Sequence, residues 1–421
     1  MSSIVVGLDI GTAFIKTVIG EINSENKLEI IGFSKNPSKG VRNGVIVNID
    51  AAAAVIKESI EAAEQIAGIE VDAVYTAIGG SLVEGQNSEG DVVIDKTPKH
   101  RRLEIDEDAK GRAQDSACAI ELPLEKKGLQ VAVQEYKVDD LPSCKDPLGM
   151  VGIRLKVKVF IISASETACN SLGNCVLRSG YDLIGIGSKT LVSAMVTVHE
   201  DEQDLGSILI DMGAGSTDVI VVNKGAPVFM ASVPVGGNLV TNDIALVKGL
   251  PVEEAEKIKV LHGCCWIEGN EADEEVIIPG IGGRGPEQTT RYELCQIIQP
   301  RIDEIFSMVK KEIVRHANLT RLNGSIVLTG GGALMPGIVQ LAQSVWGTTS
   351  VRIGIPSDYG NLNQDYRSAD YATAVGLVVQ NKDVLQKSGR QKSKIRGSEA
   401  NKDVDGTNVL KNLHSLFKNF F

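Results

Sequence analysis

The chain has 421 residues, which exceeds the length at which a single hydrophobic core stops growing, so two or more domains are expected. Its 43% hydrophobic and 23% charged residues are ordinary for a soluble globular protein. The formal net charge of −11 at pH 7 argues against a general nucleic-acid binder, because such proteins present a basic field to the phosphate backbone.

The first predicted feature is a hairpin over residues 6–20, in which two apolar strand patterns flank a glycine-containing turn that begins Asp9-Ile-Gly11. Further strands are expected over residues 28–33 and 74–78. Between them the apolar spacing predicts a helix from Asp50 to about residue 67, with Asp50 as its N-cap and Gly68 as its C-cap.

Residues 84–162 change in character and indicate an inserted α+β subdomain. A short strand is predicted over residues 92–94, charged residues dominate residues 96–112, and residues 105–108 are typical of a helix start. Strands are predicted over residues 130–138 and 152–162, where residues 154–160 alternate with period two. A helix over residues 165–178, a strand over 183–186 and a helix that runs into His199 complete this half.

A second hairpin over residues 208–222 repeats the first, with Asp211-Met-Gly213 matching Asp9-Ile-Gly11. Its glycines let backbone N–H groups approach a polyphosphate, and a carboxylate at the end of a strand can hold a hydrated Mg²⁺. One such hairpin alone is more often an ordinary tight turn. Two hairpins at half-chain spacing indicate a duplicated fold with one phosphate loop in each half, together forming a nucleotide clamp.

The remainder of the second half is predicted from the same patterns. Residues 231–234 are followed directly by a segment over residues 235–244 that contains two adjacent glycines. Helices are expected over residues 253–261 and 291–317. Residues 280–285 formally match the G-x-G-x-x-G dinucleotide pattern, but Pro279 and Pro286 flank them and no strand runs into them, so a loop is predicted. Residues 325–334 read as a strand ending in three glycines, which suit an adenine and ribose, followed by a helix through Trp346. Residues 371–377 form a small-residue helix that is suited either to tight helix packing or to a plain core position.

The C-terminal part changes composition abruptly. Residues 382–407 are polar with a basic cluster, which indicates a disordered linker. Residues 408–421 then form an amphipathic pattern that is too short to span a bilayer but suited to its interface, with lysines that favour anionic headgroups. The apolar face contains Leu410, Leu413, Leu416, Phe417, Phe420 and Phe421. The alternative is a helix that docks on the protein itself or on a partner.

The seven cysteines are scattered and include no Cys-x-x-Cys pair, so thiols in a reduced cytosol are expected. No apolar run reaches about 18 residues, the length needed to cross a membrane. The N-terminus also lacks a basic region followed by a long apolar stretch, so no signal peptide is predicted.

Together, the two hairpins, the Thr329-Gly-Gly-Gly332 turn and the small-residue helix resemble the actin-type ATPase superfamily, which includes sugar kinases and chaperone ATPases. Within it, residues 146–155, 235–245, 254–263, 326–338 and 351–354 and the tail resemble the FtsA family of bacterial cell-division proteins. The resemblance runs from end to end and implies an α/β, actin-like fold with a duplicated, ribonuclease H-like core. Subdomain 1A would comprise residues 1–83 and 163–204, with the 1C insert at residues 84–162. Subdomains 2A and 2B would share residues 205–381, with 2B at about residues 240–322.

The resemblance also implies ATP and Mg²⁺ as cofactors and assigns the residues that bind them. Asp9 and Asp211 would hold the metal through water. The phosphates would contact Gly11, Thr12, Ala13 and Lys16 from one side and Gly213, Gly215, Ser216 and Thr217 from the other. The ribose and phosphate side would be lined by Gly236 and Gly237, the nucleoside by Glu256 and Lys259, and the adenine by Gly331, Gly332 and Ala333.

The function implied by the resemblance is that of a cell-division adaptor. It would form actin-like, head-to-tail filaments and anchor the FtsZ ring (the Z ring) to the cytoplasmic face of the inner membrane at the division septum, as a peripheral protein. The C-terminal tail of FtsZ would dock on subdomain 2B, with Arg291 and Arg301 as candidates for its acidic groups or as ordinary surface charges. Later divisome proteins would be recruited through 1C.

The turn before the helix that runs into His199 departs from the superfamily pattern. Many members place Glu or Gln before Pro there, facing the attacking water, whereas this chain has Lys189 and Thr190. A protonated lysine has no lone pair to orient water, so slow or absent ATP hydrolysis is expected, with ATP as an assembly ligand.

Two other functions remain open from the sequence. A small-molecule kinase of the same superfamily would need a carboxylate base, for which Asp218 is the candidate, and would leave the tail unexplained. An adaptor of the PilM type for pilus assembly shares the core and the insert, but the tail and residues 238–245 favour FtsA.

Overall fold

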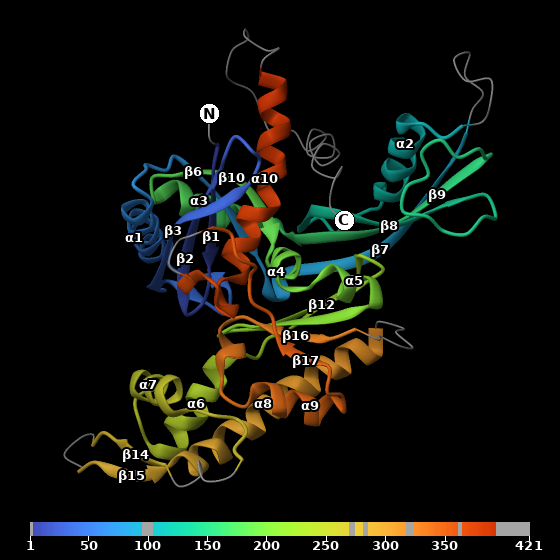
Figure 1. Cartoon of the computed structure of the whole chain (residues 1–421). Coiled ribbons are helices and arrows are strands. Elements are labelled where there is room, and N and C mark those ends of the chain that lie inside the picture. Colours follow the sequence, from blue (N-terminus) through green and yellow to red (C-terminus); the bar gives the residue numbers. More distant parts are fainter. Residues whose placement is uncertain are drawn as a thin grey trace.

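The computed structural model describes residues 3–94, 104–268, 274–280, 285–316, 324–360 and 364–392. Two five-stranded sheets form its centre (Figure 1), with the strand orders β10-β6-β1-β2-β3 and β17-β16-β11-β12-β13. The strands of the first sheet are β1 (Ser3–Ile10), β2 (Phe14–Ile22), β3 (Leu28–Pro37), β6 (Ala73–Ile78) and β10 (Asp182–Ser188). Those of the second are β11 (Ser207–Met212), β12 (Thr217–Asn223), β13 (Ala226–Val233), β16 (Ile326–Thr329) and β17 (Val351–Ile353).

The two sheets have the same topology. In each, the first three strands form an antiparallel meander, and the first strand also pairs in parallel with a later strand, which is β6 in one half and β16 in the other. This repetition confirms the duplicated, actin-like core. It also places the two hairpin turns at equivalent positions, at the ends of β1 and β11.

Helices cover both faces of the first sheet. Helices α1 (Ile49–Ala67) and α3 (Glu166–Arg178) pack on one face, and α10 (Ala372–Lys392) packs on the other. The N-cap prediction for α1 was wrong by two residues: the side chain of Asn48 accepts a hydrogen bond from the Ala51 N–H, and Asp50 lies in the first turn. There its carboxylate still complements the helix dipole. Gly68 is the left-handed C-cap, as predicted.

The small-residue helix packs as closely as its composition allows. A Cβ on Gly376 of α10 would come within 2.1 Å of the Val192 carbonyl oxygen in α4 (Lys189–Thr197). A Cβ on Gly7 of β1 would meet the Ala374 carbonyl oxygen at 2.3 Å. Helix α4 itself lies between the halves, because Val192 packs in the core with α10 whereas Leu191 packs in the core shared with the second sheet.

The insert folds as the sheet β7-β9-β8 with one helix beside it (Figure 1). Its elements are β7 (Val83–Val93), α2 (Glu107–Cys118), β8 (Lys126–Val138) and β9 (Arg154–Ser165). The first strand is much longer than the stretch predicted at residues 92–94, because its N-terminal part is polar and gives no apolar alternation. Asp106 caps α2 by accepting from the Ala109 N–H at 2.8 Å.

The remaining elements belong mostly to the second half. They are β4 (Val41–Arg42), β5 (Val45–Ile46), α5 (Glu200–Leu205), α6 (Gly237–Lys248), α7 (Val252–His262), β14 (Glu275–Ile278), β15 (Glu287–Thr290), α8 (Arg291–His316) and α9 (Ile338–Trp346). Short 3₁₀ turns are η1 (Gly80–Leu82), η3 (Gly331–Leu334), η4 (Gln364–Tyr366) and η5 (Ala369–Tyr371). Helices α8 and α9 pack in the core of the second sheet.

The remaining predictions concern the C-terminal part of the chain, the glycine loop, the cysteines and membrane-spanning helices. The predicted start of the linker at residue 382 is too early, because α10 continues to Lys392. The rest of that linker, the amphipathic tail and residues 281–284 of the predicted glycine loop lie outside the described residues. None of the seven cysteines, all within the described ranges, forms a disulfide. Among the described helices, none is long and apolar enough to cross a membrane.

Candidate functional site: a cleft between two hairpins

Both hairpin turns open onto one cavity of about 270 Å³ between the two halves. Most of the residues predicted from the sequence to contact a nucleotide line it. They are Asp9, Gly11, Thr12, Ala13, Lys16, Asp211, Gly213, Thr217, Gly236, Gly237, Glu256, Lys259, Gly331 and Gly332. Gly215 and Ser216 instead line an adjoining cavity of about 240 Å³, and Ala333 is fully buried beneath the turn that it helps to form.

The two turns have the same local geometry. The N–H of Gly11 donates to the Phe14 carbonyl at 3.0 Å, and the N–H of Gly213 donates to the Ser216 carbonyl at 2.9 Å. Strand pairing places Asp9 opposite Lys16 in one hairpin and Asp211 opposite Asp218 in the other. In each hairpin a buried carboxylate therefore lies two residues before the first glycine of the turn.

Glycine is required where the second loop meets its neighbours. A Cβ on Gly236 would come within 2.5 Å of the Gly213 carbonyl oxygen, and one on Gly332 within 2.7 Å of the Met212 Cβ. Gly330 has a φ of +82°, and a Cβ there would meet the Asp211 carboxylate at 2.3 Å. The backbones of segments distant in sequence thus converge on the end of β11, beside the cavity.

The floor of the cleft concentrates charge. Lys189, the first residue of α4, places its Nζ 3.3 Å from Asp9 Oδ1, and Asp211 and Asp218 lie nearby. Burial raises the pKa of Asp211 to about 6, with the neighbouring carboxylates adding to the effect of burial and Lys189 opposing it. Burial alone would lower the pKa of Lys189, but the three carboxylates outweigh it and raise that pKa, so the ammonium stays charged.

A second group of charges lies along the first hairpin. Asp370 forms ion pairs with Lys16 at 3.4 Å and with Lys35 at 2.9 Å. Although burial opposes it, these cations hold the pKa of Asp370 at about 2. Burial lowers the pKa of Lys16, which also donates to the Asp370 carbonyl. Asp370 therefore fixes the position of Lys16 beside the first hairpin turn.

One end of the cleft is built by α6 and α7. Lys259 Nζ lies 2.7 Å from Glu256 Oε2, 2.8 Å from Thr241 Oγ1 and 3.2 Å from the Gly237 carbonyl oxygen. With Gly331 and Gly332 opposite, this end combines a flat backbone surface with a paired cation and carboxylate. Such a surface suits a planar base and a ribose.

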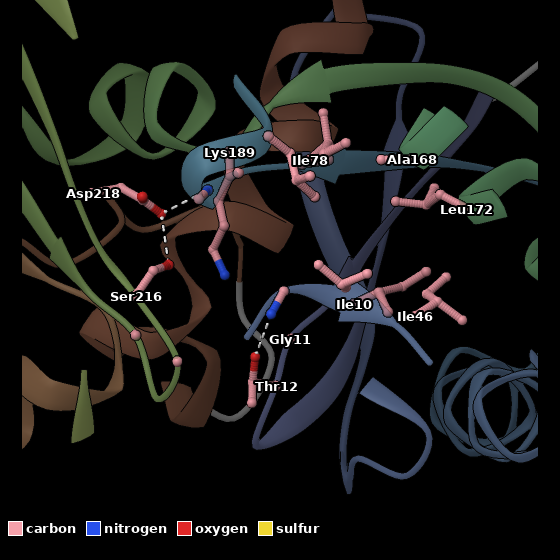
Figure 2. Close-up of a pocket in the computed structure, with 18 of the residues that line it drawn as sticks. Ile10, Gly11, Thr12, Ile46, Ile78, Ala168, Leu172, Lys189, Ser216 and Asp218 are labelled. Carbon is pink, nitrogen blue, oxygen red and sulfur yellow. Dashed lines mark hydrogen bonds between the residues drawn. The ribbon is translucent and has the colours of Figure 1, made fainter. Parts of the chain in front are cut away.

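The adjoining cavity extends beyond the turns (Figure 2). One wall is apolar and includes Ile10, Ile78 and Leu172, while the opposite side presents Lys189 and Asp218. The Gly80 N–H donates to Asp218 Oδ2 at 3.2 Å, and burial raises the pKa of this carboxyl. The candidate kinase base is therefore already held by backbone from the first half.

The two arginines predicted to meet a partner are both paired within the chain. Arg291 Nη1 lies 3.0 Å from Glu274 Oε2. Arg301 forms a fork with Asp243, with Nε–Oδ2 at 2.6 Å and Nη2–Oδ1 at 3.0 Å, and also contacts Glu304. These pairs give both side chains a structural role.

Three residues at the cleft were not assigned from the sequence as ligands. Lys189 was noted only as a departure at its turn, and neither Lys35 nor Asp370 was singled out. Asp370 lies just before the small-residue helix at residues 371–377, so a carboxylate preceding that helix was the available signal. Lys35 gives no local signal, because its role depends on β3 pairing with β2.

The residues present fit a nucleotide with a hydrated divalent cation. The two turns offer glycine backbone to phosphates, and Asp9 and Asp211 offer oxygen ligands that Mg²⁺ accepts, with water completing its shell. A side chain at Gly236 or Gly332 would collide with the backbone or Cβ of the loop after β11, so the close packing of these loops around the cavity requires glycine.

Comparisons with known proteins agree with this geometry. The family model described as cell division protein FtsA matches residues 208–376, and the SHS2 domain inserted in FtsA matches residues 80–163. The cell division protein FtsA of Borreliella burgdorferi is 40% identical over 378 residues, covering 90% of each chain. That of Pseudomonas aeruginosa is 34% identical over 410 residues, covering 97% of this chain and 96% of the relative.

Solved structures show the same fold at low identity. A PilM–PilN type IV pilus biogenesis complex gives a TM-score of 0.63 at 17% identity, covering 90% of this chain and 98% of the other. MreB5 of Spiroplasma citri bound to ADP gives 0.55 at 15% identity, covering 92% and 98%. Below 25% identity, these likenesses establish the actin-like fold alone.

Proposed function

Because the chain belongs to the FtsA family of cell division proteins, we propose that it binds ATP with Mg²⁺ and serves as a membrane adaptor for the division ring. The observation that carries the nucleotide part is that both hairpin turns open onto one cavity of about 270 Å³. Asp9 and Asp211 would hold the cation through water, and the cation would neutralise phosphate charge. Glu256 and Lys259 would orient the nucleoside.

ATP acts as an assembly ligand in this proposal, and the chain forms head-to-tail filaments like actin. Lys189 stands on α4 at the cleft floor, where it offers only N–H donors and cannot orient an attacking water. Hydrolysis is therefore slow or absent. Steady-state phosphate release by the purified protein checks this point, and rapid turnover would contradict it.

The docking surface for the FtsZ tail is proposed on the subdomain built from α6, α7, β14, β15 and α8. Large apolar side chains are exposed on its elements, namely Leu246, Val247, Val252, Val260, Leu261 and Ile277. Arg291 and Arg301 lie on α8 of the same subdomain, and acidic groups of the tail would share them with Glu274 and Asp243. The insert extends from the first half of the chain, away from this subdomain (Figure 1). A partner docked on the subdomain would therefore leave the insert accessible to later divisome proteins.

The amphipathic tail at residues 408–421 is the proposed membrane anchor, which makes the protein peripheral on the cytoplasmic face at the septum. The test compares the full-length protein with one ending at Asp405, each sedimented in Mg-ATP with anionic or neutral liposomes. The full chain should pellet with anionic liposomes only, and the shortened chain should stay in solution. Equal pelleting of the two chains would contradict the anchor, and a soluble full chain would indicate that the tail binds protein.

A further inference from the structure

Lys189 occupies the boundary between the two cavities. It lines both of them, together with Gly11, Thr12, Asp211 and Gly213 of the hairpin turns. Its stem lies against Gly79, where an added Cβ would meet the Lys189 Cβ at 3.0 Å. Figure 2 shows the side chain directed into the pocket between Asp218 and the first turn. Gly331 and Gly332 line only the larger cavity, so the ammonium lies on the side of that cavity that adjoins the smaller one.

The cations of the cleft are distributed along its length. Lys259 is held at the nucleoside end by Glu256 and Thr241, and Lys16 is held in the middle by Asp370. Lys189 is the cation at the far end, and its bond to Asp9 is a single contact of 3.3 Å. A triphosphate that extends from the nucleoside end past the turns brings its last phosphate toward that position.

The position of α4 keeps this lysine in place. The helix is packed between the halves through Leu191 and Val192, and Ser193 Oγ lies 3.4 Å from Asp211 Oδ2 and 3.0 Å from Thr373 Oγ1. The start of the helix is therefore fixed relative to the second hairpin. Only the side chain of Lys189 has to move to exchange one anionic partner for another.

We propose that Lys189 recognises the terminal phosphate of a nucleoside triphosphate and so makes the site selective for ATP over ADP. The proposal rests on the ATP binding proposed above. On binding of a triphosphate, the ammonium transfers its contact from Asp9 to the terminal phosphate, which releases Asp9 for the hydrated cation. A diphosphate ends short of Lys189 and leaves the Lys189–Asp9 pair intact. Lys189 is thus a specificity-determining residue and takes part in no bond-breaking step.

The test measures dissociation constants for Mg-ATP and Mg-ADP by isothermal titration calorimetry on the full-length protein. The variants are Lys189→Gln, which removes the charge, Lys189→Arg, which keeps it, and the control Lys257→Gln, an exposed lysine on α7 outside the cleft. A charged hydrogen bond of the usual strength predicts that Lys189→Gln weakens ATP binding by about 10-fold or more. ADP binding should change by less than about 3-fold, Lys189→Arg should restore most of the preference, and Lys257→Gln should match the wild type.

The outcomes separate this inference from the proposed function. Equal losses of ATP and ADP affinity in Lys189→Gln would overturn the inference and assign Lys189 a structural role, as would unchanged affinity for both. A wild type that binds both nucleotides equally would also overturn it while leaving ATP binding intact. A wild type that binds neither nucleotide would overturn the proposed function itself. Thermal unfolding of each variant verifies that the protein remains folded.

Discussion

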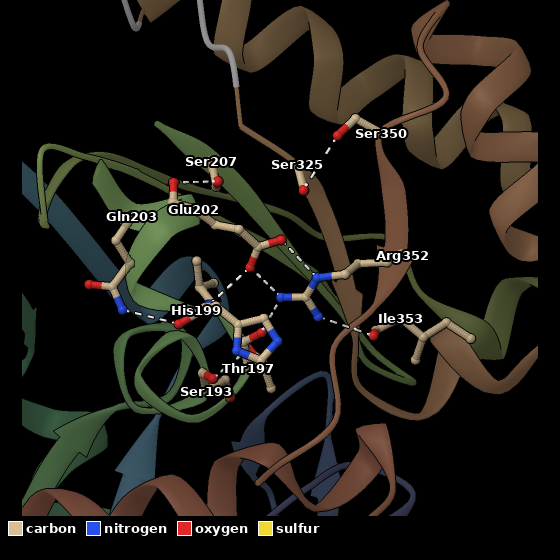
Figure 3. Close-up of polar contacts among 11 residues, drawn as sticks. Ser193, Thr197, His199, Glu202, Gln203, Ser207, Ser325, Ser350, Arg352 and Ile353 are labelled. Atoms are coloured by element: carbon tan, nitrogen blue, oxygen red, sulfur yellow. Dashed lines mark hydrogen bonds and ion pairs between the residues drawn. The ribbon is translucent and has the colours of Figure 1, made fainter. Parts of the chain in front are cut away.

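The ion pair between Arg352 and Glu202 gives the most quantitative prediction (Figure 3). Arg352 of β17 donates from Nε to Glu202 Oε1 at 2.8 Å and from Nη2 to the Thr197 carbonyl oxygen at 2.7 Å, at the end of α4. Glu202 Oε2 also accepts from the His199 N–H at 2.9 Å. The pair therefore ties the C-terminal end of α4, whose first residue is Lys189, to the second sheet.

The magnitude follows from the pKa of Glu202, whose side chain is only 13% exposed. Burial alone would raise this pKa, but hydrogen bonds from Arg352, His199 and Ser325 outweigh burial and lower it from 4.5 to about 2. The difference corresponds to about 3 kcal/mol of stability at neutral pH. Because the folded-state pKa is lowered, this stability is fully present above pH 4.5 and is lost as the pH falls toward 2.

The perturbation is Glu202→Gln, followed by urea unfolding monitored by circular dichroism at pH 7 and pH 3. The substitution should lower the free energy of unfolding of the affected transition by about 3 kcal/mol at pH 7 and by about half of that at pH 3. Asp204→Asn is the control, since its ion pair with Lys145 is two-thirds exposed and should contribute little. Equal destabilisation at both pH values, or none at pH 7, would refute the reasoning.

Three further predictions follow from close contacts. Gly376→Ala should lower stability by about 1–3 kcal/mol in thermal unfolding, because its Cβ meets the Val192 carbonyl oxygen, whereas Gly285→Ala, with no atom within 4 Å, should not. Gly236→Ala should weaken ATP binding by about 10-fold or more in calorimetry, since it displaces the Gly213 loop; unchanged affinity would show that the loop does not hold phosphate. Arg301→Ala should both weaken binding of an FtsZ tail peptide in fluorescence anisotropy and lower the melting temperature, because Asp243 loses its fork; a lower melting temperature with unchanged peptide binding would leave Arg301 structural only.

Much of the fold could be predicted because the chain repeats itself. The two hairpins have matching residues at matching positions, and the structure confirms them as equivalent turns of two sheets with one topology. The predictions that failed concern single elements, and each failure has a physical cause. The polar strand β7 gives no apolar alternation, and the cap of α1 falls on Asn48, which is as good a capping residue as Asp50.

The loops of the candidate site could be predicted from the sequence, but the ion pairs between its charged side chains could not. Glycines at a turn indicate from the sequence alone that the backbone there can approach a ligand or another segment closely. The glycines at residues 11, 213, 236 and 237 all line the cavity. The Lys16–Asp370–Lys35 group joins residues hundreds of positions apart, so it depends on tertiary packing that no local pattern encodes. The pairing of Arg301 with Asp243 likewise needs α6 and α8 side by side.

The central claim is that a nucleotide binds in the cleft between the hairpins, and Lys259 tests it most directly. Isothermal titration calorimetry of the full-length protein with Mg-ATP would compare the wild type with Lys259→Ala and with Lys257→Ala on the same helix. Lys259 is largely buried at the nucleoside end, while Lys257 is exposed and outside the cavity. We predict saturable binding to the wild type and to Lys257→Ala, and binding weakened about 10-fold or more in Lys259→Ala. Equal affinity for ATP in all three proteins, or no binding to the wild type, would contradict the account.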